Sequence, residues 1–103
     1  MKTEIIKKIK AKKAVIGVIG LGYVGLPLNL CFVEKGFRSI GFDIDTNKIK
    51  LLNQSKSYIK HIPSERIANA VQSTLFSVTT DFSRLKECDA ILIAVPTPLN
   101  KNR

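Results

Sequence analysis

The sequence has few of the residues that usually build metal sites and nucleophilic catalytic centres. Its 103 residues include two cysteines, one histidine and no tryptophan. Cys31 and Cys88 form neither a CxxC pair nor a metal-ligand spacing, so they predict buried thiols rather than a disulfide framework or a zinc site. His61 lies in an expected loop with no nucleophile beside it in the sequence, which favours a structural or surface role. We therefore predict no metal site and no catalytic residue in this chain.

Acidic residues are also scarce: 8 aspartates and glutamates stand against 17 lysines and arginines, for a formal net charge of +9. The excess is concentrated at the N-terminus, where residues 1–13 hold six lysines and one glutamate. No aromatic side chain is interleaved there for base stacking, so we interpret residues 1–13 as a basic leader without a nucleic-acid partner. The alternative is a nucleic-acid-binding domain driven by this leader, which would bind in a salt-dependent way.

The leader is followed by an uncharged run, residues 14–33, which is long enough to span a bilayer. Four glycines and Pro27 interrupt this run, and such breakers favour a strand, a turn and a helix over one continuous membrane helix. The sequence also lacks a convincing small-residue cleavage site of a secretory signal. With 45% hydrophobic and 24% charged residues, the composition is that of a globular domain, and we predict a cytoplasmic protein without a membrane partner.

Hydrophobic periodicity predicts alternating strands and helices. We expect strands at 14–19, 39–43, 75–80 and 90–95. We expect helices from the glycine cluster to Gly36, over 46–53 and from Ser64 as an N-cap, a polar loop at 54–63, and a short helical turn at 82–86. The last strand is wholly apolar and is expected to be buried, with an open edge as a hazard for self-association. This order indicates an α/β fold, a Rossmann-like doubly wound parallel sheet of about four strands with helices on both faces.

The most informative motif is GLGYVG, in which Gly20, Gly22 and Gly25 lie between the first expected strand and the first expected helix. A G-x-G-x-x-G motif alone is a weak signal, but this context is typical of a dinucleotide site. Gly20 would permit the tight turn, Gly22 the approach of a pyrophosphate, and Gly25 the close packing of helix and strand. Unpaired amides at the helix N-terminus would then attract the phosphates.

Asp43 ends the second expected strand, eighteen residues beyond Gly25. This is near the spacing of a carboxylate that hydrogen-bonds the two hydroxyls of an adenosine ribose. Because a carboxylate repels a 2′-phosphate, NAD is favoured over NADP. The alternative is that GLGYVG is only a tight turn and Asp43 only a helix cap, with no ligand site. In that case the three glycines, the flanking strand and helix, and the aspartate would have to occur together by chance. FAD and S-adenosylmethionine sites share parts of the pattern and stay as alternatives.

Four motifs in order resemble the N-terminal segment of the UDP-glucose/GDP-mannose dehydrogenase family: GLGYVGLPL, GFDID with a lysine just beyond, SYIKHIP and VPTPL. The resemblance covers residues 14–103, and SYIKHIP is more similar to the bacterial UDP-N-acetylhexosamine 6-dehydrogenases than to the UDP-glucose enzymes. Outside this resemblance, VPTP is simply a strand followed by a stiff turn, and Tyr58 is a packing or surface residue. The NAD-binding residues that the resemblance implies are Gly20, Leu21, Gly22, Tyr23, Val24, Gly25, Asp43, Lys48, Val95, Pro96, Thr97 and Pro98.

The resemblance also implies a reaction, the NAD-dependent oxidation of the C6 alcohol of a UDP-sugar to a carboxylate for surface polysaccharide synthesis. The family's cysteine nucleophile lies far downstream, with the sugar-nucleotide site and the dimerising helix, and neither Cys31 nor Cys88 matches it. We therefore expect residues 14–103 to be an incomplete Rossmann domain that binds NAD and is inactive alone. The full-length enzyme would bind the UDP-sugar and form a homodimer or a higher oligomer. A stand-alone dinucleotide-binding or regulatory module is the alternative.

Overall fold

The computed structural model describes residues 13–94, in which four strands alternate with helices. The expected elements are confirmed there, and their ends differ from the expected ones by one or two residues. Residues 1–12 of the predicted leader and residues 95–103 lie outside the described residues. The elements are β1 (Val15–Ile19), α2 (Gly25–Glu34), β2 (Arg38–Phe42), α3 (Thr46–Asn53), α4 (Ser64–Gln72), β3 (Phe76–Thr79), the 3-10 helix η1 (Phe82–Glu87) and β4 (Ala90–Ile93).

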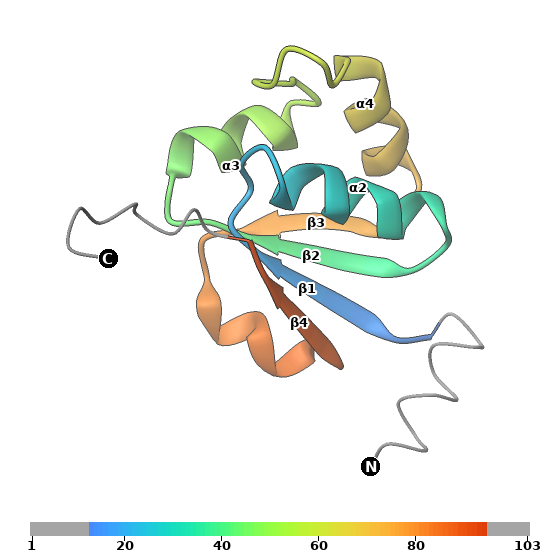
Figure 1. Ribbon diagram of the computed structural model, residues 1–103, viewed down its shortest axis with the longest axis vertical. Coiled ribbons are helices and arrows are strands. Elements are labelled where there is room, and N and C mark those ends of the chain that lie inside the picture. Colours follow the sequence, from blue (N-terminus) through green and yellow to red (C-terminus); the bar gives the residue numbers. More distant parts are fainter. Residues whose placement is uncertain (1–12, 95–103) are drawn as a thin grey trace, which may run out of the picture.

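The four strands form one parallel sheet in the order β3-β2-β1-β4 (Figure 1). β1 pairs with β2 from Val15 opposite Arg38, and with β4 from Ile16 opposite Ala90. The chain builds outward from β1 to β3 and then crosses back to the other side of β1, so the strand order reverses at β1. This is the α/β, Rossmann-like arrangement that the sequence predicts, and ligands of such sheets bind outside the carboxyl ends of the strands at the reversal.

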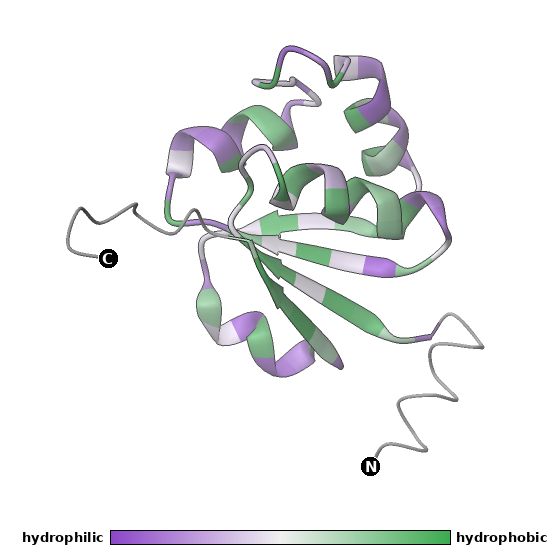
Figure 2. Cartoon of the chain, viewed as in Figure 1, coloured by the Kyte–Doolittle hydropathy of each residue, from purple (hydrophilic) through white to green (hydrophobic). Residues whose placement is uncertain are grey.

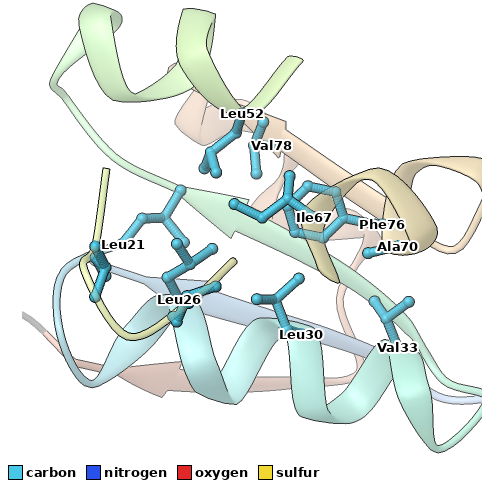
Figure 3. Close-up of a cluster of buried hydrophobic side chains, with 11 residues drawn as sticks. Leu21, Leu26, Leu30, Val33, Leu52, Ile67, Ala70, Phe76 and Val78 are labelled. Atoms are coloured by element: carbon cyan, nitrogen blue, oxygen red, sulfur yellow. The ribbon is translucent and has the colours of Figure 1, made fainter. Parts of the chain in front are cut away.

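Different helices cover the two faces of the sheet (Figure 1). Helices α2, α3 and α4 lie over one face, and η1 lies on the other. On the first face, side chains of α2, α4 and β3 form the main core cluster with Leu21 from the turn after β1 (Figure 3). Leu26 and Leu30 of α2 are fully buried. On α4, Ile67 and Ala70 face the core, whereas the apolar residue Val71 is exposed.

Two expectations for the segment between α3 and α4 are wrong. The sequence predicts Ser64 as the N-cap of α4, but Pro63 precedes the helix, and the Ser64 hydroxyl instead accepts the N–H of Ser57 at 3.0 Å. The loop at 54–63 is not polar throughout, because Ile59 and Ile62 are buried in the main core cluster. The reason is geometric: the loop joins two helices on the same face and crosses the core between them.

β4 also differs from expectation, because it forms but is not buried. The exposed fractions are 44% for Ile91, 37% for Leu92 and 72% for Ile93, although Figure 2 shows β4 as a hydrophobic strand. Among the strands at residues 13–94, β1 is its only neighbour. Within the same residues, no helix is long and apolar enough to cross a membrane.

Candidate functional site

The glycine motif forms the turn between β1 and α2, at the carboxyl end of the central strand. Gly20 has a φ of 95°, a left-handed conformation that glycine adopts at little cost, and its N–H donates to the Phe42 carbonyl at 2.7 Å. A Cβ at Gly25 would lie 1.5 Å from the carbonyl oxygen of Gly20. Only glycine therefore lets the first residue of α2 pack directly on the turn.

Gly22 differs from these two glycines, because a Cβ added to it would meet nothing within 4 Å. Its backbone borders open space, which is what a pyrophosphate approaching the turn requires. The N-cap of α2 is Val24, whose apolar side chain cannot accept a hydrogen bond from the first helical amides. The start of α2 thus has the character of an anion site, with helix amides that no capping side chain occupies.

Asp43 follows β2 directly, and its carboxylate joins the glycine turn to the segment that leads into α3. Oδ2 accepts the N–H of Leu21 at 2.9 Å, and Oδ1 accepts the N–H of Asp45 at 2.9 Å. The Asp43 side chain is only 12% exposed, and the ammonium of Lys48 lies 4.0 Å from Oδ2. Since each carboxylate oxygen can accept more than one hydrogen bond, a ribose at Asp43 would share the carboxylate with the turn.

Tyr58, which the sequence suggests is a packing or surface residue, contacts the glycine turn from the loop at 54–63. Its hydroxyl donates to the Leu21 carbonyl at 2.5 Å, and the Lys48 ammonium lies 5.7 Å from the centroid of its ring. Burial, together with the nearby carboxylates of Asp43 and Asp45, raises the pKa of Tyr58 above its ordinary value of 10.0. The phenol therefore keeps its proton and stays a hydrogen-bond donor.

These residues surround a cavity of about 810 Å³ at the carboxyl ends of β1, β2 and β4. Of the predicted site residues, those that line it are Gly20, Leu21, Gly22, Tyr23, Val24, Asp43 and Lys48. Gly25 lies against the turn, and the predicted residues Val95, Pro96, Thr97 and Pro98 lie outside the described residues. The lining residues that sequence reasoning missed are Ile44, Tyr58, Ile59 and Ala94.

One signal could have pointed to part of the missed set. Ile44 follows Asp43 directly at the end of an expected strand, which is where ligands of such sheets bind, and in the structure its apolar side chain is 85% exposed next to the cavity. Exposed apolar side chains around a few polar groups are typical of ligand sites. Tyr58 belongs to the SYIKHIP motif, but no local pattern predicts its hydrogen bond to Leu21, because 37 residues separate the two.

Neither the cysteines nor the histidine lines the cavity. Cys88 packs against β1, where a Cβ at Gly17 would lie 2.7 Å from its Sγ, and burial raises the pKa of its thiol. Cys31 is a partly buried free thiol. His61 is exposed, and its ring stacks on Tyr23 with 6.3 Å between the ring centroids. The described part of the chain holds no group of three or more metal-ligating His, Cys, Asp or Glu residues.

Comparisons with known proteins agree on one family. A family model for the "UDP-glucose/GDP-mannose dehydrogenase family, NAD binding domain" matches residues 14–103. Protein CapL of Staphylococcus aureus is 39% identical over 87 residues, which cover 84% of this chain and 19% of that protein. The UDP-N-acetyl-D-glucosamine 6-dehydrogenase of Salmonella typhi is 35% identical over 85 residues, 82% of this chain and 19% of that protein.

A solved structure gives the same result for the fold. The GDP-mannose dehydrogenase of Pseudomonas aeruginosa superposes with a TM-score of 0.78 at 37% identity, covering 84% of this chain and 20% of that one. The chain thus spans about a fifth of the length of the relatives that it matches.

Proposed function

The chain belongs to the UDP-glucose/GDP-mannose dehydrogenase family, and we propose on this premise that it is the NAD-binding part of a nucleotide-sugar 6-dehydrogenase. NAD is the cofactor of the domain that it matches, and when bound it supplies the hydride acceptor for an alcohol oxidation. The relatives are several times longer than this chain, so the activity itself is a proposal for the whole protein. We assign residues 14–103 to the NAD-binding domain and residues 1–13 to a leader.

The observation that carries this proposal is the shape of the glycine turn beside the cavity. The open space at Gly22 and the close approach at Gly25 suit a pyrophosphate laid across the turn. The cavity volume of about 810 Å³ lies within the usual range for small-molecule and cofactor sites. We propose that the backbone from Gly20 to Gly25 holds the pyrophosphate, with the amides of Tyr23 and Val24 facing it.

The adenosine end of the cofactor would lie at Asp43. Its carboxylate is fixed by two backbone amides, so it can accept ribose hydroxyls without first losing side-chain freedom. Its negative charge would repel a 2′-phosphate, which supports NAD over NADP. Lys48 would lie beside the ribose, and its position 4.0 Å from the Asp43 carboxylate supports this. From the family resemblance we propose that residues 95–98, which lie outside the described residues, line the cofactor as well.

For the whole protein, we propose a UDP-N-acetylhexosamine as the substrate and a uronate for surface polysaccharide as the product. The SYIKHIP loop and the UDP-N-acetyl-D-glucosamine 6-dehydrogenase among the relatives support this sugar. A GDP-mannose 6-dehydrogenase of Pseudomonas aeruginosa has a similar identity, 38%, so overall similarity does not choose the sugar. We also propose that the enzyme is cytoplasmic and works as a homodimer or a higher oligomer.

Calorimetric titration of NAD and NADP into the wild-type chain and an Asp43→Asn variant tests the cofactor site. Asparagine removes the charge and keeps one of the two acceptor oxygens, which can still accept the N–H of Leu21. We therefore expect the variant to bind NAD about five- to ten-fold more weakly and to lose much of its preference over NADP, since a hydrogen bond to a charged group contributes about 1–1.5 kcal/mol more than a neutral one. Asp45→Asn is the matched control, because Asp45 caps α3 and does not line the cavity. Unchanged affinities in Asp43→Asn would remove Asp43 from the ribose site.

The substrate is tested in the full-length gene product by following NADH formation with UDP-N-acetylglucosamine, UDP-N-acetylmannosamine, UDP-glucose and GDP-mannose. We expect turnover with an N-acetylhexosamine nucleotide and none by the 103 residues alone. Preferred turnover of GDP-mannose or UDP-glucose would contradict the proposed sugar. Turnover by the 103 residues would contradict the proposal that the chemistry needs the rest of the enzyme.

A further inference from the structure

Leu21, the residue between the first two glycines of the motif, is fixed by two hydrogen bonds and by packing in the core. Its N–H donates to Asp43 Oδ2 at 2.9 Å, and its carbonyl accepts the Tyr58 hydroxyl at 2.5 Å. Its side chain is fully buried in the main core cluster (Figure 3). The peptide groups before and after Leu21 are therefore both fixed, one by Asp43 and the other by Tyr58.

The second of these peptide groups matters for a ligand at the turn. The Leu21 carbonyl and the Gly22 N–H belong to one planar trans unit, in which they point in opposite directions. The bond from Tyr58 therefore sets the direction of the Gly22 N–H as well. It also occupies a carbonyl oxygen whose partial negative charge would oppose a nearby phosphate.

The ring of Tyr58 makes a separate contact with Lys48. The Lys48 ammonium lies 5.7 Å from the ring centroid and 4.0 Å from Asp43 Oδ2, so it sits between an aromatic face and a carboxylate. A lysine side chain has several rotatable bonds and loses freedom when it is held. The ring thus favours a Lys48 position at the wall of the cavity, beside Asp43.

We propose that Tyr58 is a positioning residue of the NAD site, whose hydroxyl orients the glycine turn through Leu21 and whose ring holds Lys48 beside Asp43. This inference rests on the proposed function, since it assumes that the cavity takes NAD. Tyr58 acts through two other residues and transfers no proton. Its loop is anchored in the core by Ile59 and Ile62, so the loop keeps its place without the hydroxyl.

The two contacts use different parts of the side chain and can be removed one at a time. Tyr58→Phe removes the hydroxyl and keeps the ring face for Lys48, whereas Tyr58→Leu removes both. Gln54→Ala is the control in the same loop, because Gln54 is exposed and does not line the cavity. Affinities for NAD and for adenosine, which lacks the pyrophosphate, are measured by NMR titration of the 15N-labelled chain.

We expect Tyr58→Phe to weaken NAD binding about five-fold, the effect of one neutral hydrogen bond, and to leave adenosine binding unchanged. We expect Tyr58→Leu to weaken the binding of both ligands, and Gln54→Ala to weaken the binding of neither. The Gly22 amide resonance should shift in Tyr58→Phe even without ligand. A merely structural role would lower NAD and adenosine affinity together in both Tyr58 variants.

The outcomes separate this inference from the proposed function. If the wild-type chain binds NAD and Tyr58→Phe binds it equally well, the inference is wrong and the proposed function stands. Equal losses for NAD and adenosine in Tyr58→Phe would also overturn the inference. If the wild-type chain binds no NAD, both are overturned.

Discussion

The face of the sheet under α2 and α4 and the outer strand β4 use the same kinds of apolar residue in opposite ways. Leu30 on α2 is fully buried, whereas Leu92 on β4 is 37% exposed. We call the face under α2 and α4 the packed region. The cavity lies where the packed region meets β4, because its glycine turn belongs to the packed region and its lining residue Ala94 follows β4. The comparison teaches that the turn owes its shape to a packed core on one side, and that burial cannot be inferred from apolar character alone.

The largest effect should come from a substitution where α2 packs on the turn. In Gly25→Ala the new Cβ would meet the backbone carbonyl of Gly20 at 1.5 Å, so α2 must shift, and we expect a loss of more than about 4 kcal/mol in unfolding free energy. Gly22→Ala is the matched control, because its Cβ would meet nothing within 4 Å, and we expect a loss of no more than about 1 kcal/mol. Urea unfolding followed by circular dichroism measures both.

The same pair of variants separates fold from function. Gly22→Ala should stay folded and bind NAD more weakly, because its methyl group would occupy the space at the turn. Equal stability of the two alanine variants would show that α2 can move away from the turn, and the packed region would then be less rigid than the structure indicates.

The next effect compares one residue type in the two regions. Leu30→Ala removes a fully buried side chain and should cost about 2–5 kcal/mol of unfolding free energy. Leu92→Ala removes a partly exposed side chain on β4, and we expect a loss of less than about 1 kcal/mol. Chemical denaturation of the 103-residue chain measures both losses. Similar losses would mean that β4 is covered in solution, for example by a second copy of the chain.

The elements of this fold could be predicted from the sequence because their signals are local. Asp45 directly precedes the expected helix at 46–53, and in the structure its side chain caps α3 by accepting the amides of Asn47 and Lys48. The glycine spacing likewise predicts the turn, because a left-handed Gly20 and a Cβ-free Gly25 are local steric requirements.

The burial of β4 and the contacts of the loop at 54–63 could not be predicted in this way. The burial of a strand depends on which other elements pack against it. The local sequence of β4 therefore does not predict that the strand is exposed within the described residues. The hydrogen bond from Tyr58 to Leu21 joins residues 37 positions apart. Predictions of the site therefore included the residues of the turn and Asp43, and missed the loop that holds the turn from outside.

The smallest effect concerns an ion pair at the solvent edge of the packed region. Arg66 of α4 donates two hydrogen bonds to Glu34 of α2, from Nε at 2.7 Å and from an Nη nitrogen at 2.9 Å. The hydrogen bond from Arg66 lowers the pKa of Glu34 from its ordinary value of 4.5. Because the Glu34 side chain is 46% exposed, solvent screens the pair, and we expect Glu34→Gln to cost less than about 1 kcal/mol at pH 7.

The pH dependence of this loss follows from the direction of the pKa shift. A carboxyl whose pKa is lower in the folded state stabilises the fold fully above the unfolded value, and this contribution disappears as pH falls through the folded pKa. The difference in unfolding free energy between wild type and Glu34→Gln should therefore be constant above about pH 6 and shrink below pH 4.5. Urea titrations at several pH values measure it. A difference that persists at pH 3 would assign the loss to packing between α2 and α4 and not to charge. The ion pair would then contribute no measurable free energy to the stability of the packed region.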